Sequence, residues 1–277
     1  MTALRRPVLV AAFEGWNDAG DAATGAVEHL AEVWDAQVTA ELDPDPYYDF
    51  QVNRPTVSLE DGVTRRITWP TTRLSVCRVE GSERDLVLVR GVEPNMRWRG
   101  FCEEIIALAR GLDVAEVVTL GALLADSPHT RPVPVSGTSS DPELATRLGL
   151  EHSRYEGPTG IVGVLQEACV RAGLPAVSFW AAVPHYVAHP PCPKATVALL
   201  RRLEDLLDVT IPLADLPEQA RAWERQVDEL AAEDSDVAEY VASLEEREPE
   251  EDLPEASGEA IAKEFERFLR RQEPGTT

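Results

Sequence analysis

Apolar residues recur along the chain with two different periods. Continuous apolar runs bounded by turn residues predict buried strands at residues 8–13, 85–90, 116–124 and 176–183. Apolar positions three or four residues apart predict amphipathic helices at residues 18–34, 98–112, 160–172 and 193–207. Because strands and helices alternate, the pattern favours an α/β fold. Helices should cover both faces of a central mixed sheet and give a three-layer sandwich.

Shorter patterns add further elements to this sheet. Strands are predicted at 38–42, 74–79 and 131–135, and period-two alternation around Asp61-Gly62 predicts a hairpin within 56–69. The hydroxyl-rich segment 136–140 is interpreted as capping, with Ser140 or Asp141 as the cap of a helix that begins at Pro142. Thr159 is expected to cap the helix at 160–172.

After Pro212 the pattern is helical and strongly acidic. Helices are predicted at residues 216–230, 237–244 and 256–271. Residues 213–277 hold 20 acidic and 7 basic side chains, whereas the first 212 residues hold 29 and 19. We therefore expect an α/β domain at 1–212 and an acidic helical extension at 213–277. The apolar faces of the extension must pack on the domain or on another subunit.

Charge and composition exclude several classes of function. The net charge of −23 disfavours nucleic acid and anionic membranes as partners, because both require basic surface. No apolar segment approaches the roughly 20 residues needed to span a bilayer. The four cysteines are widely separated, form no C-x-x-C pair and accompany no export signal, so we expect reduced thiols in a cytoplasmic protein.

Motifs of catalysis and of metal binding are also missing from the sequence. There is no G-x-S-x-G nucleophile elbow, and the five histidines show neither H-x-H nor H-x-x-x-H spacing. We therefore expect no catalytic residue, no metal site and no cofactor.

The loop after the first strand, Glu14 to Gly20, lies where α/β domains usually bind ligands. Its carboxylates would compete with a phosphate for the positive end of the next helix. We interpret Asp18 as a helix cap, with a neutral or cationic ligand such as a base, a ribose or a peptide amine as the alternative. Asn17 lies in the same loop.

Three more polar residues follow predicted strands and should reach the same edge of the sheet. Glu93 and Asn95 could hold a purine edge or ribose hydroxyls, or could simply form a turn around Pro94. His185 follows the last strand. The candidate ligand pocket therefore consists of Glu14, Asn17, Asp18, Glu93, Asn95 and His185.

Five segments occur in an order that resembles the PAC2 family, proteins similar to proteasome assembly chaperone 2, and in particular its actinobacterial branch. They are FEGWNDAGDAA, RGVEPN, GALLADSPHTRPVPV, YEGPTGIVGVL and PHYVAHPPCPKATVALL. The resemblance implies a fold like that of purine nucleoside phosphorylases and related hydrolases. It also implies a homo-oligomer, which we expect to be a dimer or a trimer.

Archaeal relatives that bind proteasome rings use a C-terminal hydrophobic-Tyr-X tail. This chain ends in RRQEPGTT, so docking on a proteasome by that route is not expected. The leading hypothesis is a non-catalytic oligomeric scaffold or assembly-chaperone-like protein that binds a protein partner. The alternative is a nucleoside- or peptide-processing enzyme that uses the candidate pocket.

Overall fold

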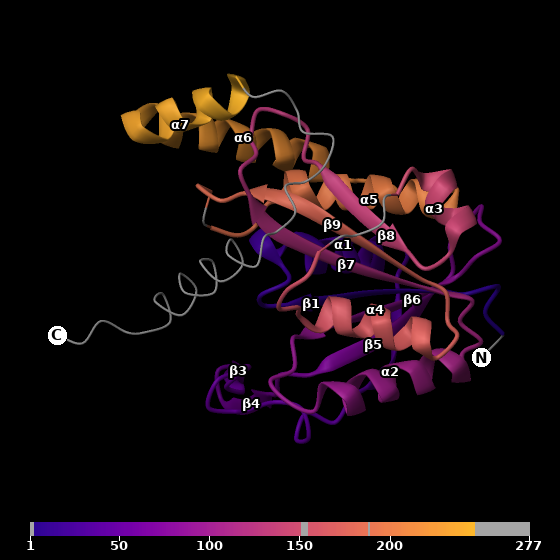
Figure 1. Ribbon diagram of the computed structural model, residues 1–277. Coiled ribbons are helices and arrows are strands. Elements are labelled where there is room, and N and C mark those ends of the chain that lie inside the picture. Colours follow the sequence, from indigo (N-terminus) through magenta and orange to yellow (C-terminus); the bar gives the residue numbers. More distant parts are fainter. Residues whose placement is uncertain (1–2, 151–154, 188, 247–277) are drawn as a thin grey trace.

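A computed structural model describes residues 3–150, 155–187 and 189–246 of the 277-residue chain. Seven strands form one mixed sheet in the order β2-β5-β6-β1-β7-β9-β8 (Figure 1). Their bounds are Val8–Glu14 (β1), Gln37–Glu41 (β2), Thr72–Cys77 (β5), Leu86–Val92 (β6), Glu116–Ala125 (β7), Val135–Ser139 (β8) and Ala176–Pro184 (β9). The sheet confirms the predicted α/β fold.

The four central strands are parallel, and antiparallel strands complete the sheet on either side. In β1, Val8 pairs with Leu86 of β6 and with Glu116 of β7, while β7 pairs along its length with β9. Strands β5, β2 and β8 run antiparallel to their neighbours. Strand β1 is almost fully buried because helices cover both faces, which explains its continuous apolar run.

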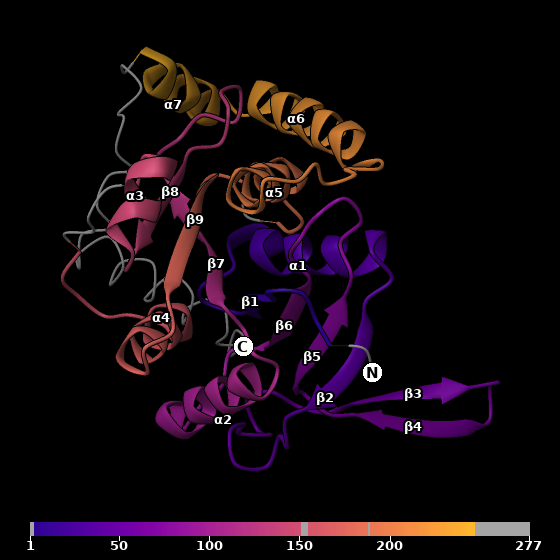
Figure 2. The ribbon, with the colours of Figure 1, turned by 90° about the vertical axis from the view of Figure 1, so that its right-hand side faces the viewer.

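Two pairs of helices form the outer layers of the sandwich (Figure 2). One face carries α1 (Ala22–Val33) and α5 (Pro193–Leu207), and the other carries α2 (Trp98–Gly111) and α4 (Ile161–Arg171). Each layer closes its own apolar core against the sheet. A short 3₁₀ turn, Ala19–Asp21, precedes α1, and α3 (Pro142–Leu148) follows β8. Asp141 caps α3 as expected, accepting the amide hydrogens of Glu143 and Leu144.

The predicted hairpin is present and stands apart from the sandwich. Strands β3 (Thr56–Glu60) and β4 (Thr64–Thr68) form a separate two-stranded sheet that projects beyond the edge of the main sheet (Figure 2). All ten of their residues are exposed.

Beyond Pro212, the structure describes two of the three predicted helices. Helix α6 (Leu216–Glu233) packs on α5 and inserts Trp223 and Val227 into the core of the α1–α5 layer. Helix α7 (Ser235–Glu246) packs on α6. The predicted helix at 256–271 lies outside the described residues, and the domain boundary at 212 stays a prediction. Among the helices that the structure describes, none is long and apolar enough to cross a membrane.

Strand β8 differs from the prediction in position. The strand expected at 131–135 forms instead at Val135–Ser139, over the segment that was interpreted as capping. Its backbone pairs with β9, where Gly137 lies opposite Phe179. A Cβ atom at Gly137 would come within 2.8 Å of the Phe179 ring, so the close approach of the two strands requires glycine there. Hydroxyl side chains fit this strand because it is an edge strand that is only partly buried.

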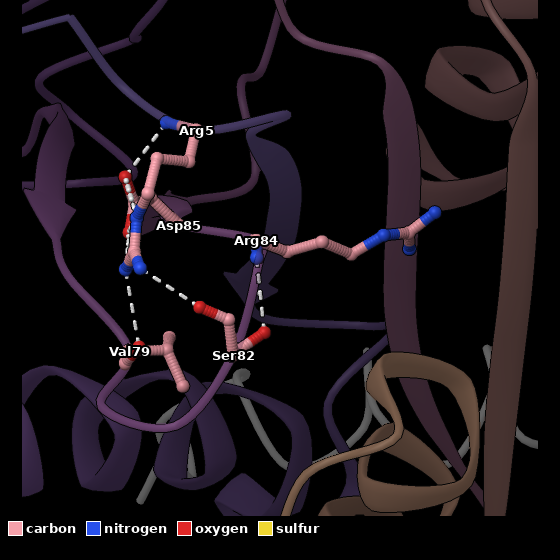
Figure 3. Close-up of polar contacts among 5 residues, drawn as sticks. All are labelled: Arg5, Val79, Ser82, Arg84 and Asp85. Carbon is pink, nitrogen blue, oxygen red and sulfur yellow. Dashed lines mark hydrogen bonds and ion pairs between the residues drawn. The ribbon is translucent and has the colours of Figure 1, made fainter.

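A buried carboxylate, Asp85, lies directly before β6 and binds Arg5, which precedes β1 (Figure 3). The Asp85 side chain is fully buried and accepts hydrogen bonds from the Arg5 amide (2.7 Å) and from the Arg5 guanidinium (Nε to Oδ1, 3.1 Å). The same guanidinium donates to the Ser82 and Val79 carbonyls. Burial raises the pKa of Asp85, but the hydrogen bonds and charge of Arg5 outweigh burial and hold that pKa below its ordinary value.

Candidate functional site

The carboxyl ends of the parallel strands β1, β6, β7 and β9 meet at one edge of the sheet. Glu14 ends β1, Glu93 follows β6, and His185 follows β9. The loop after β1 folds back over this edge, because the Asn17 carbonyl accepts the amide hydrogen of Ala122 in β7. Ligands of open α/β sheets bind at this edge. The predicted site therefore lies where the fold would place one.

Asn17 and Glu93 form the centre of the site. The Asn17 amide nitrogen donates to Glu93 Oε1 over 2.7 Å, and the amide of Ile161, the first residue of α4, donates to the same oxygen over 2.8 Å. Glu93 is therefore the cap of α4, whereas Thr159 was expected to fill that role and the helix has no side-chain cap of its own. Burial raises the pKa of Glu93 above its ordinary value, and these hydrogen bonds oppose the shift only in part.

The space around Asn17 is tightly filled. A Cβ atom at Gly160 would come within 2.3 Å of the Asn17 side-chain nitrogen, so only glycine fits at the start of α4. The Asn17 Oδ1 atom is buried without a hydrogen-bond partner. Because Glu93 occupies the positive end of α4, an anionic ligand would have to displace a carboxylate there.

Asp18 binds its own backbone, as expected of a helix cap. Its Oδ1 atom accepts the amide hydrogens of Ala23 (2.7 Å) and Thr24 (3.3 Å), and the Thr24 hydroxyl donates to its Oδ2 atom. The side chain is almost fully buried, and burial raises its pKa from 3.8 to about 6. The hydrogen bonds to Thr24 and Ala23 oppose this shift.

Glu14 faces a different part of the edge. Arg90 forms ion pairs with Glu14 (3.3 Å) and with Glu28 of α1 (3.4 Å). These three residues line a surface groove of about 690 Å³ that also includes Trp69, beside β4, and Arg54. The groove joins the α1 face of the sheet to the base of the hairpin.

The structure does not bring Asn95 and His185 into the centre of the site. The Asn95 side-chain oxygen accepts the amide hydrogen of Asp49 and a hydrogen from the Asn53 side chain, both over 2.9 Å. It thereby fixes the loop at 47–53. His185 Nδ1 lies 3.3 Å from Asp126 Oδ1, and its ring packs edge-on against Tyr240 of α7. Ligand binding by the six predicted residues stays a prediction.

A second polar cluster, which the sequence did not predict, lies between the sheet edge and α6. His129 is buried, its Nδ1 lies 2.7 Å from the Tyr186 hydroxyl, and its Nε2 lies 2.9 Å from Asp228 Oδ1. Because the Asp228 carboxylate can only accept, Nε2–H donates to it. In the neutral imidazole Nδ1 then accepts from the Tyr186 hydroxyl, whose oxygen also accepts the His129 amide hydrogen. Lys194 bridges the His129 carbonyl and Glu224 of α6. The signals in the sequence were a histidine in the loop at 128–131, a histidine and a tyrosine in the turn at 183–186, and Lys194 at the start of a predicted helix.

This His129 cluster resembles a triad but lacks a nucleophile. Burial raises the pKa of Tyr186 to about 12, which keeps the phenol protonated and unreactive at neutral pH. The cluster instead joins the sheet edge to α6. Among the described residues, no group of three or more His, Cys, Asp or Glu side chains is arranged to hold a metal ion.

Comparison with known proteins decides the family. The model of the PAC2 family matches residues 12–231, which include the sheet apart from the first four residues of β1, both helical layers and most of α6. The chain belongs to the PAC2 family. No curated protein matches it significantly.

Two solved PAC2-like structures are close relatives. A PAC2 family protein from Streptomyces avermitilis is 69% identical, and the match covers 85% of this chain and 99% of that one with a TM-score of 0.80. A proteasome-assembly chaperone homologue from Mycobacterium tuberculosis is 64% identical, with coverage of 84% and 99% and a TM-score of 0.78. Both organisms are actinobacteria, as the sequence segments predicted.

The PAC2 fold extends to distant proteins. An archaeal proteasome activator from Pyrococcus furiosus shares 17% identity, and the match covers 82% of this chain and 94% of that one with a TM-score of 0.66. At this identity the likeness shows the fold alone. The family and the three-layer fold predicted from the sequence are thus confirmed.

Proposed function

We propose that this PAC2 protein is a non-catalytic, oligomeric scaffold that works in the manner of an assembly chaperone. The observation that carries the proposal is its 64% identity, over nearly the whole of that chain, to a proteasome-assembly chaperone homologue. Such a protein acts through surfaces that fit a partner rather than through a reactive pocket.

The polar groups at the sheet edge support a non-catalytic role. Asp18 holds the start of α1 and Glu93 holds the start of α4, so both carboxylates are used by the fold. A general acid or base needs a proton-transfer partner on the substrate within hydrogen-bond reach. In this site backbone amides and the side chains of Asn17 and Thr24 already donate to the two carboxylates.

We further propose that the protein acts in the cytoplasm on a protein partner. The cysteines Cys77, Cys102, Cys169 and Cys192 are all free and buried, as suits a reducing compartment.

Cross-linking and partner capture test this function. The tagged full-length protein is cross-linked in cells of its source and captured proteins are identified by mass spectrometry, with sedimentation of the pure protein in parallel. We expect an oligomer and a reproducible protein partner. A monomer that captures nothing would contradict the proposal. A nucleoside or peptide that raises the melting temperature, and loses this effect with Glu93→Gln, would favour the enzyme alternative instead.

A further inference from the structure

The β3–β4 hairpin has one apolar and one polar face. Cross-strand pairs place Val57 opposite Ile67 and Leu59 opposite Arg65, so these four side chains share a face. The alternate positions carry Thr, Ser, Glu and Arg. Leu59 is 63% exposed and Ile67 57% exposed. An isolated two-stranded hairpin is at best marginally stable in water, so an apolar face on one indicates a surface that is covered in an assembly.

The hairpin is also locally neutral in an acidic protein. Residues 56–68 hold two arginines and two acidic side chains, against a net charge of −23 for the chain. Arg66 pairs with Glu60 on the polar face. Arg65, on the apolar face, forms no ion pair or hydrogen bond with the described residues. A partner for this face therefore needs apolar side chains with carboxylates beside them.

The exposed surface of α6 has this chemistry. Leu230 is 62% exposed, and the helix places Glu229 and Glu233 beside it. These two carboxylates are four residues apart on one side of the helix, where like charges repel. Neither forms an ion pair with another described residue. Residues 216–246 hold ten acidic and two basic side chains, so the whole surface attracts cations.

The two surfaces of one chain cannot meet each other. Both views place the hairpin and α6 at opposite ends of the molecule (Figures 1 and 2). Complementary surfaces that lie far apart on one subunit are those that join successive copies, and a closed assembly satisfies both surfaces of every copy. The complementarity of charge and of apolar area therefore indicates a second copy of this chain as the occupant.

We propose that the apolar face of the β3–β4 hairpin docks on the α6 surface around Leu230 of a second copy, with Arg65 beside Glu229 and Glu233. This inference rests on the proposed oligomeric function and names the surfaces that would build the oligomer. The hairpin is suited to the task because it projects beyond the sheet edge and carries its apolar side chains away from its own core.

Sedimentation velocity of the full-length protein at micromolar concentration tests the apolar contact. We expect Ile67→Asp to weaken association at least tenfold in Kd, because it places a carboxylate in the apolar face next to an acidic surface. The matched control is Ser58→Asp, which adds the same charge to the polar face of the same hairpin and should leave the mass unchanged. Circular dichroism verifies that both variants remain folded.

A charge exchange tests the partner surface. Arg65→Glu alone and Glu229→Arg with Glu233→Arg should each weaken association, and all three substitutions in one chain should restore it. An oligomer that keeps the wild-type Kd with Ile67→Asp and Arg65→Glu overturns this inference and leaves the scaffold function standing. A wild-type monomer overturns the inference as well, and overturns the function only if no partner is captured.

Two other occupants of the hairpin face are further outcomes of the same experiment. If Ile67→Asp leaves the mass unchanged but accelerates hydrogen exchange in residues 247–277, the chain's own C-terminal segment covers the hairpin and the inference is overturned. If Ile67→Asp dissociates the oligomer while the Glu229 and Glu233 variant does not, the hairpin meets a different surface, and the assignment of α6 is overturned.

Discussion

Asp18 shows how a side chain placed where a ligand is expected can be held by the fold. Its carboxylate has lost nearly all contact with water and accepts hydrogen bonds from the start of α1. Short-range sequence reasoning found this role, because the cap and the amides that it binds are at most six residues apart. Glu93 and Ile161 are 68 residues apart, so their contact depends on how β6 and α4 are brought together, which no local pattern encodes.

The raised pKa of Asp18 predicts a pH dependence of stability. Between pH 4 and 6 the folded protein holds a proton that the unfolded chain has lost, so the free energy of unfolding falls as the pH rises through this window. Relative to Asp18→Asn, wild type should lose about 2 to 3 kcal/mol between pH 4 and 7. Urea unfolding at both values measures this.

The exposed Asp35→Asn is the control for the change in net charge. It should show the same pH dependence as wild type. If Asp18→Asn also follows the wild-type profile, the folded Asp18 carboxyl titrates as it does in the unfolded chain, and the explanation by burial is wrong.

Elements whose bounds depend on pairing with a neighbouring strand were the hardest to predict. The strand expected at 131–135 forms four residues later, because pairing with β9 selects the register around Gly137. Helices with a clear apolar face, such as α2 and α5, lie within one residue of their predicted bounds. The join between the sheet edge and α6 was missed because His129 and Asp228 are 99 residues apart.

Two glycine substitutions, one at the start of α4 and one at the end of α2, should change the free energy of unfolding in opposite directions. Gly160→Ala should lower the free energy of unfolding by about 1 to 3 kcal/mol, because its methyl group would overlap the Asn17 side chain that holds Glu93. Gly111→Ala, at the end of α2 with nothing within 4 Å, should raise it by about 0.5 kcal/mol. Urea denaturation compares them. Equal stability of both variants would mean that the space beside Asn17 can adapt.

Because His129 binds Asp228 of α6, His129→Ala should destabilise the contact between α6 and the sheet edge. Removing the imidazole leaves Tyr186 without its acceptor and releases Asp228, at a cost of about 1 to 3 kcal/mol. Hydrogen exchange should accelerate across residues 216–246 and remain unchanged in β1 and β6. Tyr186→Phe keeps the hydrogen bond between His129 and Asp228 of α6, so it should accelerate exchange in residues 216–246 less. Acceleration spread evenly over the sheet would contradict the local role.

At the scale of the whole molecule, the two cores share one sheet and should unfold together. Cys77 and Cys192 lie in the core of the α1–α5 layer, and Cys102 and Cys169 lie in the core of the α2–α4 layer. Burial raises the pKa of the first three in sequence to about 12 and that of Cys192 to about 11, so the native thiols are protonated.

Labelling with a thiol reagent tests this cooperativity. No described cysteine should react in the native protein at pH 8, and all four should become reactive at one urea concentration. Peptide mapping after a pulse of reagent assigns each site. If one pair reacts at lower urea than the other, the layers open separately and the sheet does not couple them.

The pairing of β1 also affects how the protein is made. Residues 8–14 leave the ribosome before their partners on either side, β6 and β7, which follow only at residues 86–92 and 116–125. At roughly 5 to 20 residues per second, this apolar segment waits on the order of ten seconds for a neighbour. The nascent chain therefore exposes this apolar β segment until β6 has been translated, and we expect a chaperone that binds exposed apolar segments to capture it during that interval.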